Sequence, residues 1–144
     1  MDVLEAEQHM RDEIKALLLS QKLPVEDLPL PLSDFYVAVE TGMIRGLIGM
    51  ERYGQYGLLR SLVVDPPYRN QQIAGTLVAI LEQKAATSGI KALYLLTETA
   101  AIYFTKKGFE SINREEVPDE VKMSSEFSHV CPVSAVVMRK QLYK

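Results

Sequence analysis

The stretch from Leu62 to Leu77 constrains the fold more than any other part of the sequence. It begins as an apolar strand, turns at Pro66-Pro67, and continues as the start of an amphipathic helix. The first N–H groups of such a helix have no intrahelical acceptor, and the helix dipole favours an anion there by about 0.3–1 kcal/mol. Because Arg69 adds a cation just ahead of the helix, the stretch predicts a phosphate or pyrophosphate site.

The composition predicts a single compact domain over residues 1–144, since 144 residues with 47% hydrophobic side chains form one core comfortably and two poorly. A net charge of -3 gives no broad positive field, which argues against nucleic acid or a membrane surface as partner and favours a small soluble molecule. The chain has one cysteine, Cys131, and two histidines, so neither a disulfide within the chain nor a metal site is expected.

The first residues lack the basic and apolar segments of a secretory signal, and no apolar run approaches the roughly 20 residues of a membrane span. A cytoplasmic location is therefore expected. The sequence leaves open whether the chain forms a homodimer.

The remaining apolar pattern predicts a mixed α/β sheet with helices on both faces. Residues 58–64 read as a central strand, with Leu58, Arg60, Leu62 and Val64 on one face and the residues between them on the other. The other predicted elements are a helix over 5–19, a loop over 21–33, a hairpin of strands over 34–40 and 44–52, a helix over 72–88 closing at Gly89, a strand over 91–97, a helix over 99–107 stopped by Gly108, a strand over 109–113, a helix over 118–127 and a last strand over 134–142 whose basic residues suit an exposed end.

Two segments resemble those that flank acetyl-CoA in the GNAT N-acetyltransferases. One is Leu62-x-Val64-x-Pro66-x-x-Arg69 with Ala74 and Leu77, and the other runs from Thr97 to Tyr103-Phe104-x-x-x-Gly108-Phe109. The resemblance implies the GNAT fold, an α/β (α+β) mixed sheet split between two parallel strands, with acetyl-CoA as cosubstrate. It also implies that the Val64 N–H faces the developing oxyanion. The cofactor-binding residues implied by the resemblance are Leu62, Val63, Val64, Arg69, Asn70, Gln71, Gln72, Ile73, Ala74, Gly75, Thr76, Thr97 and Phe104.

The sequence departs from the family pattern at three positions. Asn70 and Gln72 stand where the family prefers glycine, which permits unusual φ angles and close approach of a phosphate. Asn tolerates such angles better than most residues, whereas the Cβ of Gln72 either crowds the phosphate or comes with an amide that adds a donor. Phe104 stands where the family often has a tyrosine that protonates the leaving thiolate. Tyr103 lies about 100° around the helix from it, so packing and catalysis both remain open for its side chain.

An amine nucleophile needs a base, because it is largely protonated at neutral pH. Glu51 is the leading candidate; Glu98 and Glu126 are weaker ones, and each also reads as a surface carboxylate. Arg60 and Ser61 are the predicted substrate-binding residues. A buried ion pair is the alternative for Arg60, which lies on an otherwise apolar strand.

Within the family, the sequence resembles the small acetyltransferases encoded with arsenic-resistance genes. This finer resemblance implies an arsenical or amino-acid-like amine as acceptor. A small buried apolar side chain is the expected role of Cys131, because capture of trivalent arsenic needs two or three thiolates. The residues that carry the resemblance are Leu58-Leu59-Arg60-Ser61-Leu62, Leu95-Leu96-Thr97, Thr99-Ala100-Ala101, Glu126-Phe127 and Cys131-Pro132-x-Ser134-Ala135.

Two functions follow from these observations. The first is direct transfer of acetyl from acetyl-CoA to the amine of a small molecule, without an acyl-enzyme, because no nucleophile, base and orienting residue form a recognisable set. The second is a catalytically impaired GNAT-fold module that binds CoA or a protein partner. Asn70, Gln72 and Phe104 favour the second.

Overall fold

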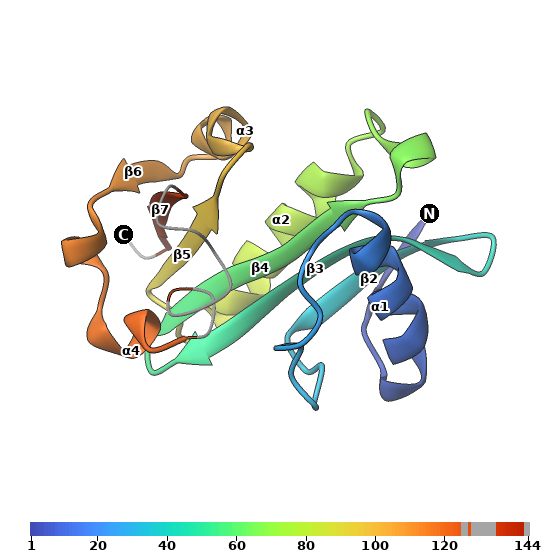
Figure 1. Cartoon of the computed structure of the whole chain (residues 1–144), viewed down its shortest axis with the longest axis horizontal. Helices are drawn as coiled ribbons and strands as arrows, with labels where there is room; N and C mark the ends of the chain where they lie inside the picture. Colours follow the sequence, from blue (N-terminus) through green and yellow to red (C-terminus); the bar gives the residue numbers. More distant parts are fainter. Residues whose placement is uncertain (125–126, 128–134, 143–144) are drawn as a thin grey trace. The chain divides into compact units, whose positions relative to one another are not determined.

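A computed structural model describes residues 1–124, 127 and 135–142. Its strands form one mixed seven-stranded sheet in the order β1-β2-β3-β4-β5-β7-β6 (Figure 1). β4 and β5 are the parallel pair, registered from Tyr56↔Ala92 to Leu58↔Tyr94. The predicted mixed α/β sheet with helices is confirmed. The elements are β1 (Asp2–Glu5), α1 (Arg11–Ser20), β2 (Phe35–Glu40), β3 (Met43–Tyr53), β4 (Tyr56–Val64), α2 (Ile73–Thr87), β5 (Ala92–Thr97), α3 (Ala101–Lys106), β6 (Glu110–Ile112), α4 (Asp119–Lys122) and β7 (Val136–Gln141), with short 3-10 helices at Gln8–Met10, Pro66–Tyr68 and Arg114–Glu116.

The chain divides into two compact units, residues 1–50 with 60–83 and residues 51–59 with 84–144. The single domain over residues 1–144 stays a prediction.

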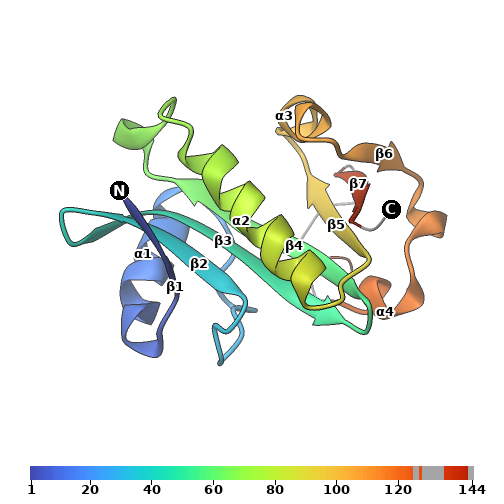
Figure 2. The ribbon, with the colours of Figure 1, turned by 180° about the vertical axis from the view of Figure 1, so that it is seen from behind.

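The first unit has a helix on each face of its strands. α1 lies nearer the viewer in Figure 1, and α2 lies nearer the viewer when the ribbon is turned over in Figure 2. The core on the α1 side includes Ile14, Leu18 and Phe35, all at most 1% exposed. α2 packs so closely that a methyl group added at Gly46 would lie 3.0 Å from Ile73 Cγ2. The helix that follows the turn is therefore fixed directly against β3.

The second unit contains β5, β6 and β7 with α3 and α4. Its core includes Leu58, Tyr94 and Val121. The last strand lies between β5 and β6, and its last residue, Gln141, is exposed. Its Arg139 pairs with Glu110 of β6 at 2.9 Å.

Three local predictions need correction. The helix predicted from residue 5 begins at Arg11, and Asp2–Glu5 form a strand that pairs antiparallel with β2. A four-residue edge strand has too little periodicity to be read from sequence, because its structure comes from pairing with a distant strand. The helix predicted over 118–127 is α-helical at Asp119–Lys122 and not at residues 123–124; the hydroxyl of Ser124 accepts the N–H of Phe127, and residues 125–126 lie outside the described residues.

The regular alternation predicted for residues 58–64 is also wrong. Ser61 has a φ of 61°, a left-handed conformation that breaks the regular alternation within β4. Arg60 lies over the ring of Phe35, and Val63 packs in the same core cluster as Phe35. Two residues three apart cannot share a face in a regular strand, so the irregularity at Ser61 changes which side chains face α1.

Candidate functional site

The turn between β4 and α2 contains two residues in the left-handed backbone conformation. After Val64 the chain makes one 3-10 turn at Pro66–Tyr68 and enters α2 at Ile73. Asn70 has a φ of 66° and Gln72 a φ of 63°. Left-handed angles are uncommon outside glycine, and here they occur at the two positions where the family resemblance expects glycine. Asn70 and Gln72 therefore adopt, as residues with a Cβ, the φ range that glycine adopts freely.

The start of α2 offers backbone donors at the surface. Residues 69–72 are exposed, and Ala74 and Gly75 are half-buried. The first helical hydrogen bond runs from the Thr76 N–H to the Gln72 carbonyl at 3.1 Å, reinforced by the Thr76 hydroxyl at 3.0 Å. The Thr76 amide is therefore used by the helix, whereas a first turn leaves the amides of residues 73–75 without helical acceptors.

The side chain of Arg69 connects the turn to two neighbouring segments by hydrogen bonds. Its Nε donates to the Val64 carbonyl at 3.3 Å, and its NH2 group donates to Gln21 Oε1 at 2.7 Å. These contacts hold Arg69 beside the end of the strand whose Val64 N–H is the predicted oxyanion donor. Leu62 is half-buried and Val63 buried, so the side chains of this strand end face largely inward.

Arg60 forms a buried bidentate ion pair. Its two terminal nitrogens lie 3.1 and 3.0 Å from the two carboxylate oxygens of Asp27, and its Nε donates to Ser61 Oγ at 3.0 Å. The Arg60 and Asp27 side chains are 1% and 11% exposed. The structure thus shows the ion-pair alternative for Arg60; binding of a substrate by Arg60 and Ser61 stays a prediction.

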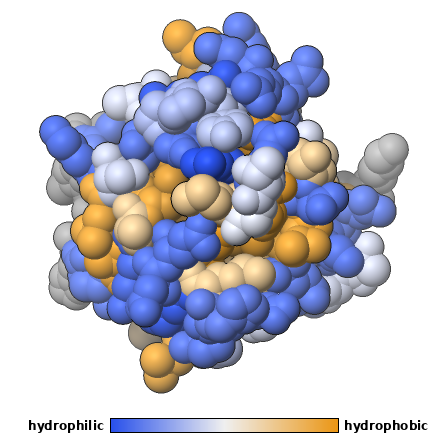
Figure 3. Space-filling view, turned by 90° about the vertical axis from the view of Figure 1, so that its right-hand side faces the viewer, coloured by the Kyte–Doolittle hydropathy of each residue, from blue (hydrophilic) through white to orange (hydrophobic). Residues whose placement is uncertain are grey.

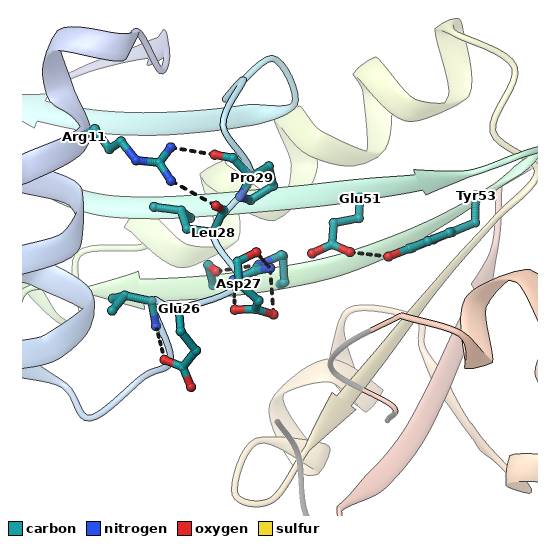
Figure 4. Close-up of polar contacts among 10 residues, drawn as sticks. Arg11, Glu26, Asp27, Leu28, Pro29, Glu51 and Tyr53 are labelled. Atoms are coloured by element: carbon teal, nitrogen blue, oxygen red, sulfur yellow. Dashed lines mark hydrogen bonds and ion pairs between the residues drawn. The ribbon is translucent and has the colours of Figure 1, made fainter. Parts of the chain in front are cut away.

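The ion pair fixes the loop over residues 21–33 to β4. The same loop is held from α1, because Arg11 donates to the carbonyls of Leu28 and Pro29 (Figure 4). Leu28 and Leu32 are buried in the core of the first unit. Because several of its carbonyls accept hydrogen bonds and some of its side chains are buried, this loop has a defined conformation within the first unit.

Glu51, the leading base candidate, lies on the part of β3 that belongs to the second unit. The hydroxyl of Tyr53 donates to its carboxylate in a short hydrogen bond (Figure 4). The Glu51 side chain is half-buried, whereas Glu98 is exposed. Glu126, the remaining candidate, lies outside the described residues.

The second motif of the resemblance forms the turn from β5 into α3. Thr97 Oγ1 accepts the N–H of Ala100 at 2.9 Å just before the helix begins. Phe104 is 5% exposed and packs edge-on against Tyr103 and Phe109, with ring centroids 5.3 and 5.5 Å away. The residue at the family's tyrosine position is therefore part of an aromatic cluster.

Tyr103 has a buried hydroxyl that finds no hydrogen-bond partner within the described ranges. Burial raises the pKa of this phenol above its ordinary value of 10.0, so the hydroxyl keeps its proton at neutral pH. Lys107 Nζ lies 5.5 Å from the ring centroid. A protonated phenol can donate to an anion; that Tyr103 does so in catalysis stays a prediction.

Sequence reasoning missed Asp27, Arg45, Tyr53 and Tyr68, which support these sites. Arg45 pairs with Asp65 at 2.9 Å and lies over the ring of Tyr68 at 4.5 Å. No local pattern distinguishes these residues from ordinary surface residues. For Arg60, the charge on an apolar strand was a signal that some acidic partner had to exist.

The residues that the structure describes contain no group of three or more His, Cys, Asp or Glu side chains arranged to hold a metal ion. Among them, no helix has the length and apolar character needed to cross a membrane.

Comparison with known proteins identifies the family. Residues 31–111, more than half of the chain, match the model of the acetyltransferase (GNAT) domain. The chain belongs to the GNAT acetyltransferase family.

Individual relatives are more distant. The amino-acid acetyltransferase of Aeromonas salmonicida is 26% identical over 97 residues, which cover 66% of this chain and 22% of that protein. The chain thus spans about a fifth of the length of this curated relative.

Solved structures share the fold. N-acetylglutamate synthase from Neisseria gonorrhoeae, complexed with coenzyme A and N-acetyl-glutamate, superposes with a TM-score of 0.85 at 19% identity over 99% of this chain and 35% of that one. Rv2747 from Mycobacterium tuberculosis, in complex with CoA, has a TM-score of 0.82 at 20% identity and is covered over its whole length.

Proposed function

We propose that this chain transfers acetyl from acetyl-CoA directly to the amine of a small, amino-acid-like molecule. The observation that carries the proposal is the turn before α2, in which Asn70 and Gln72 adopt left-handed φ angles at the two positions where the family resemblance expects glycine. Two structural relatives contain CoA, and the similar curated protein is an amino-acid acetyltransferase, which supports this cosubstrate and this class of acceptor.

The chemistry assigned to the chain is mostly that of its main chain. The amides of the first turn of α2, with Arg69, bind the pyrophosphate. The Val64 N–H stabilises the oxyanion that forms when the amine attacks the thioester, and a fixed amide does so without reorganisation. Glu51 takes the proton that the amine must lose, with Tyr53 orienting its carboxylate. The thiolate of CoA, with an ordinary thiol pKa near ~8.5, leaves adequately even without a nearby acid.

Phe104 keeps the alternative function under consideration. A buried phenylalanine at the family's tyrosine position favours a module that binds CoA and does not turn it over. Release of thiol separates the two functions, because only the enzyme converts acetyl-CoA to CoA in the presence of an amine.

The finer resemblance, to acetyltransferases encoded with arsenic-resistance genes, remains a proposal about the acceptor. Cys131, Pro132 and Ser134, which carry part of it, lie outside the described residues. An arsenical amine therefore belongs in the acceptor panel beside glutamate and other amino acids.

A cytoplasmic location and a homodimer are likewise proposals. The side of the molecule in Figure 3 shows apolar patches separated by hydrophilic side chains.

The test of the cosubstrate uses a charge placed at the start of α2. Thr76→Asp adds a carboxylate in the first turns, where it suits the helix dipole but repels a pyrophosphate. Ala79→Asp, also exposed and about one turn further along, is the matched control. For the unaltered chain, acetyl-CoA at a hundred-fold excess over Kd should stabilise the fold by about 2.7 kcal/mol.

We expect Thr76→Asp to lose most of this stabilisation and Ala79→Asp to keep it, with both variants melting near the unaltered chain in the absence of ligand. If millimolar acetyl-CoA leaves the melting temperature of the unaltered chain unchanged, the cosubstrate proposal fails. If acetyl-CoA binds but no amine in the panel releases thiol, the binding module is the better description.

A further inference from the structure

Strand β3 contains a β-bulge beside the turn. Ala38 of β2 pairs with Gly46, whereas the next residue, Val39, pairs with Ile44, so Arg45 is the extra residue between two ladder pairs. A bulge re-aims the side chain of its extra residue and is common next to functional sites. The direction of the Arg45 side chain is therefore set by an irregularity of the backbone.

Arg45 binds the start of the turn in three ways. Its carbonyl accepts the Asp65 N–H at 2.8 Å, and its NH1 group lies 2.9 Å from Asp65 Oδ2. Its guanidinium also lies 4.5 Å from the centre of the Tyr68 ring. Asp65 and Tyr68 flank the prolines, so Arg45 contacts the chain on both sides of Pro66 and Pro67.

The next residue of β3 contacts the end of the turn. Gly46 leaves just enough room for Ile73 and Leu77, which would lie 3.0 and 3.2 Å from a methyl group added there. Arg45 and Gly46 thus hold the entry and the exit of the turn that contains Asn70 and Gln72. Residues in unfavourable backbone conformations persist only when surrounding structure fixes them.

One donor atom of the Arg45 side chain gains no hydrogen bond from this arrangement. Its Nε is buried and has no hydrogen-bond partner within the described part of the chain. An unsatisfied buried donor is rare in folded proteins and calls for an explanation. Arginine is nevertheless the side chain that can pair with a carboxylate and stack on an aromatic ring at once.

We infer that Arg45 is a positioning residue for cosubstrate binding: it holds the turn over residues 65–72 in the conformation that binds the phosphates. The inference rests on the proposed function, because it concerns the same pyrophosphate site. Arg45 acts through Asp65 and Tyr68 and contacts no ligand itself. It should therefore affect the phosphate-bearing part of acetyl-CoA and leave the acetyl-pantetheine part unaffected.

The experiment compares Arg45→Met with Arg52→Met, measuring the Kd of acetyl-CoA and of acetyl-pantetheine, which lacks the pyrophosphate. Arg52 is the matched control, since it lies on the same strand and its guanidinium donates to Ser88 Oγ instead. If about a tenth of the Arg45→Met molecules have the turn in its binding conformation, the Kd of this variant for acetyl-CoA rises about ten-fold. Acetyl-pantetheine should bind all three proteins equally.

A second variant tests whether backbone strain is the link. In Arg45→Met/Gln72→Gly, glycine adopts the left-handed angle without support, so the affinity for acetyl-CoA should return toward that of the unaltered chain. Equal acetyl-CoA affinity of Arg45→Met and the unaltered chain would overturn the inference alone, as would equal losses for both ligands. Failure of the unaltered chain to bind acetyl-CoA would overturn the proposed function and the inference with it.

Discussion

Replacing Gln72 by glycine should stabilise the protein. Gln72 has a φ of 63°, and an L-residue in the left-handed region costs about 1–2 kcal/mol. Glycine removes this cost but gives the unfolded chain more freedom, which opposes the gain by about 0.4–1 kcal/mol. The net stabilisation is about 0.5–1 kcal/mol. For a chain of this size that corresponds to a rise in melting temperature of about 1–4 °C.

Gln71→Gly is the matched control, because it changes the same residue type at the neighbouring exposed position, where φ is not positive. Gln71→Gly increases the conformational entropy of the unfolded chain without relieving backbone strain in the folded state, so its melting temperature should fall. The comparison is made by thermal and urea unfolding of the three proteins without ligand. A melting temperature for Gln72→Gly at or below that of Gln71→Gly would refute the reasoning.

The same variant decides the role of the Gln72 side chain. If its Cβ crowds the phosphate, Gln72→Gly binds acetyl-CoA more tightly than the unaltered chain. If its amide donates to the phosphate, the variant binds more weakly despite its greater stability. Titration of acetyl-CoA against both proteins at one temperature distinguishes these outcomes.

Two further predictions concern buried polar groups. Asp27→Asn leaves the Arg60 charge buried with a weaker partner, so we expect a loss of up to about 3–5 kcal/mol in urea unfolding, partly recovered in Asp27→Asn/Arg60→Met; a loss under about 1 kcal/mol would contradict a structural ion pair. Burial raises the pKa of Tyr103, so the folded state holds this proton more tightly and the free energy of unfolding falls as the pH rises above about 10. Tyr103→Phe should lose less stability over that pH range. If the urea midpoints of the two proteins fall in parallel with pH, this explanation is wrong.

The course of the backbone through the turn was predictable because its determinants are local. An apolar run, two prolines and a helical period follow each other within the stretch from Leu62 to Leu77, and α2 ends before a left-handed Gly89 as its sequence predicts. The left-handed angles at Asn70 and Gln72 were not predictable, since neither residue requires them. They are consistent with support from Arg45 and Gly46, which come more than twenty residues earlier in the chain.

The other failures have the same physical origin. β1 becomes a strand only by pairing with β2, and the faces of β4 change at an irregularity at Ser61 that its residue type does not announce. Arg60 was correctly recognised as unusual, yet its partner Asp27 lies in a proline-containing loop whose sequence does not distinguish Asp27 from a surface carboxylate. Local sequence determines which segments can form; long-range contacts determine where a side chain points.

The turn of this chain has Asn70 and Gln72 where the GNAT family prefers glycine. A glycine encodes the left-handed angle at the position itself, so the turn needs little help from its surroundings. Once Asn and Gln occupy those positions, the angle must be maintained by contacts elsewhere, here the bulge at Arg45 and the close packing at Gly46. The proposed phosphate binding then depends on β3 as well as on the turn, and we expect substitutions on that strand to weaken the binding of acetyl-CoA without contacting it.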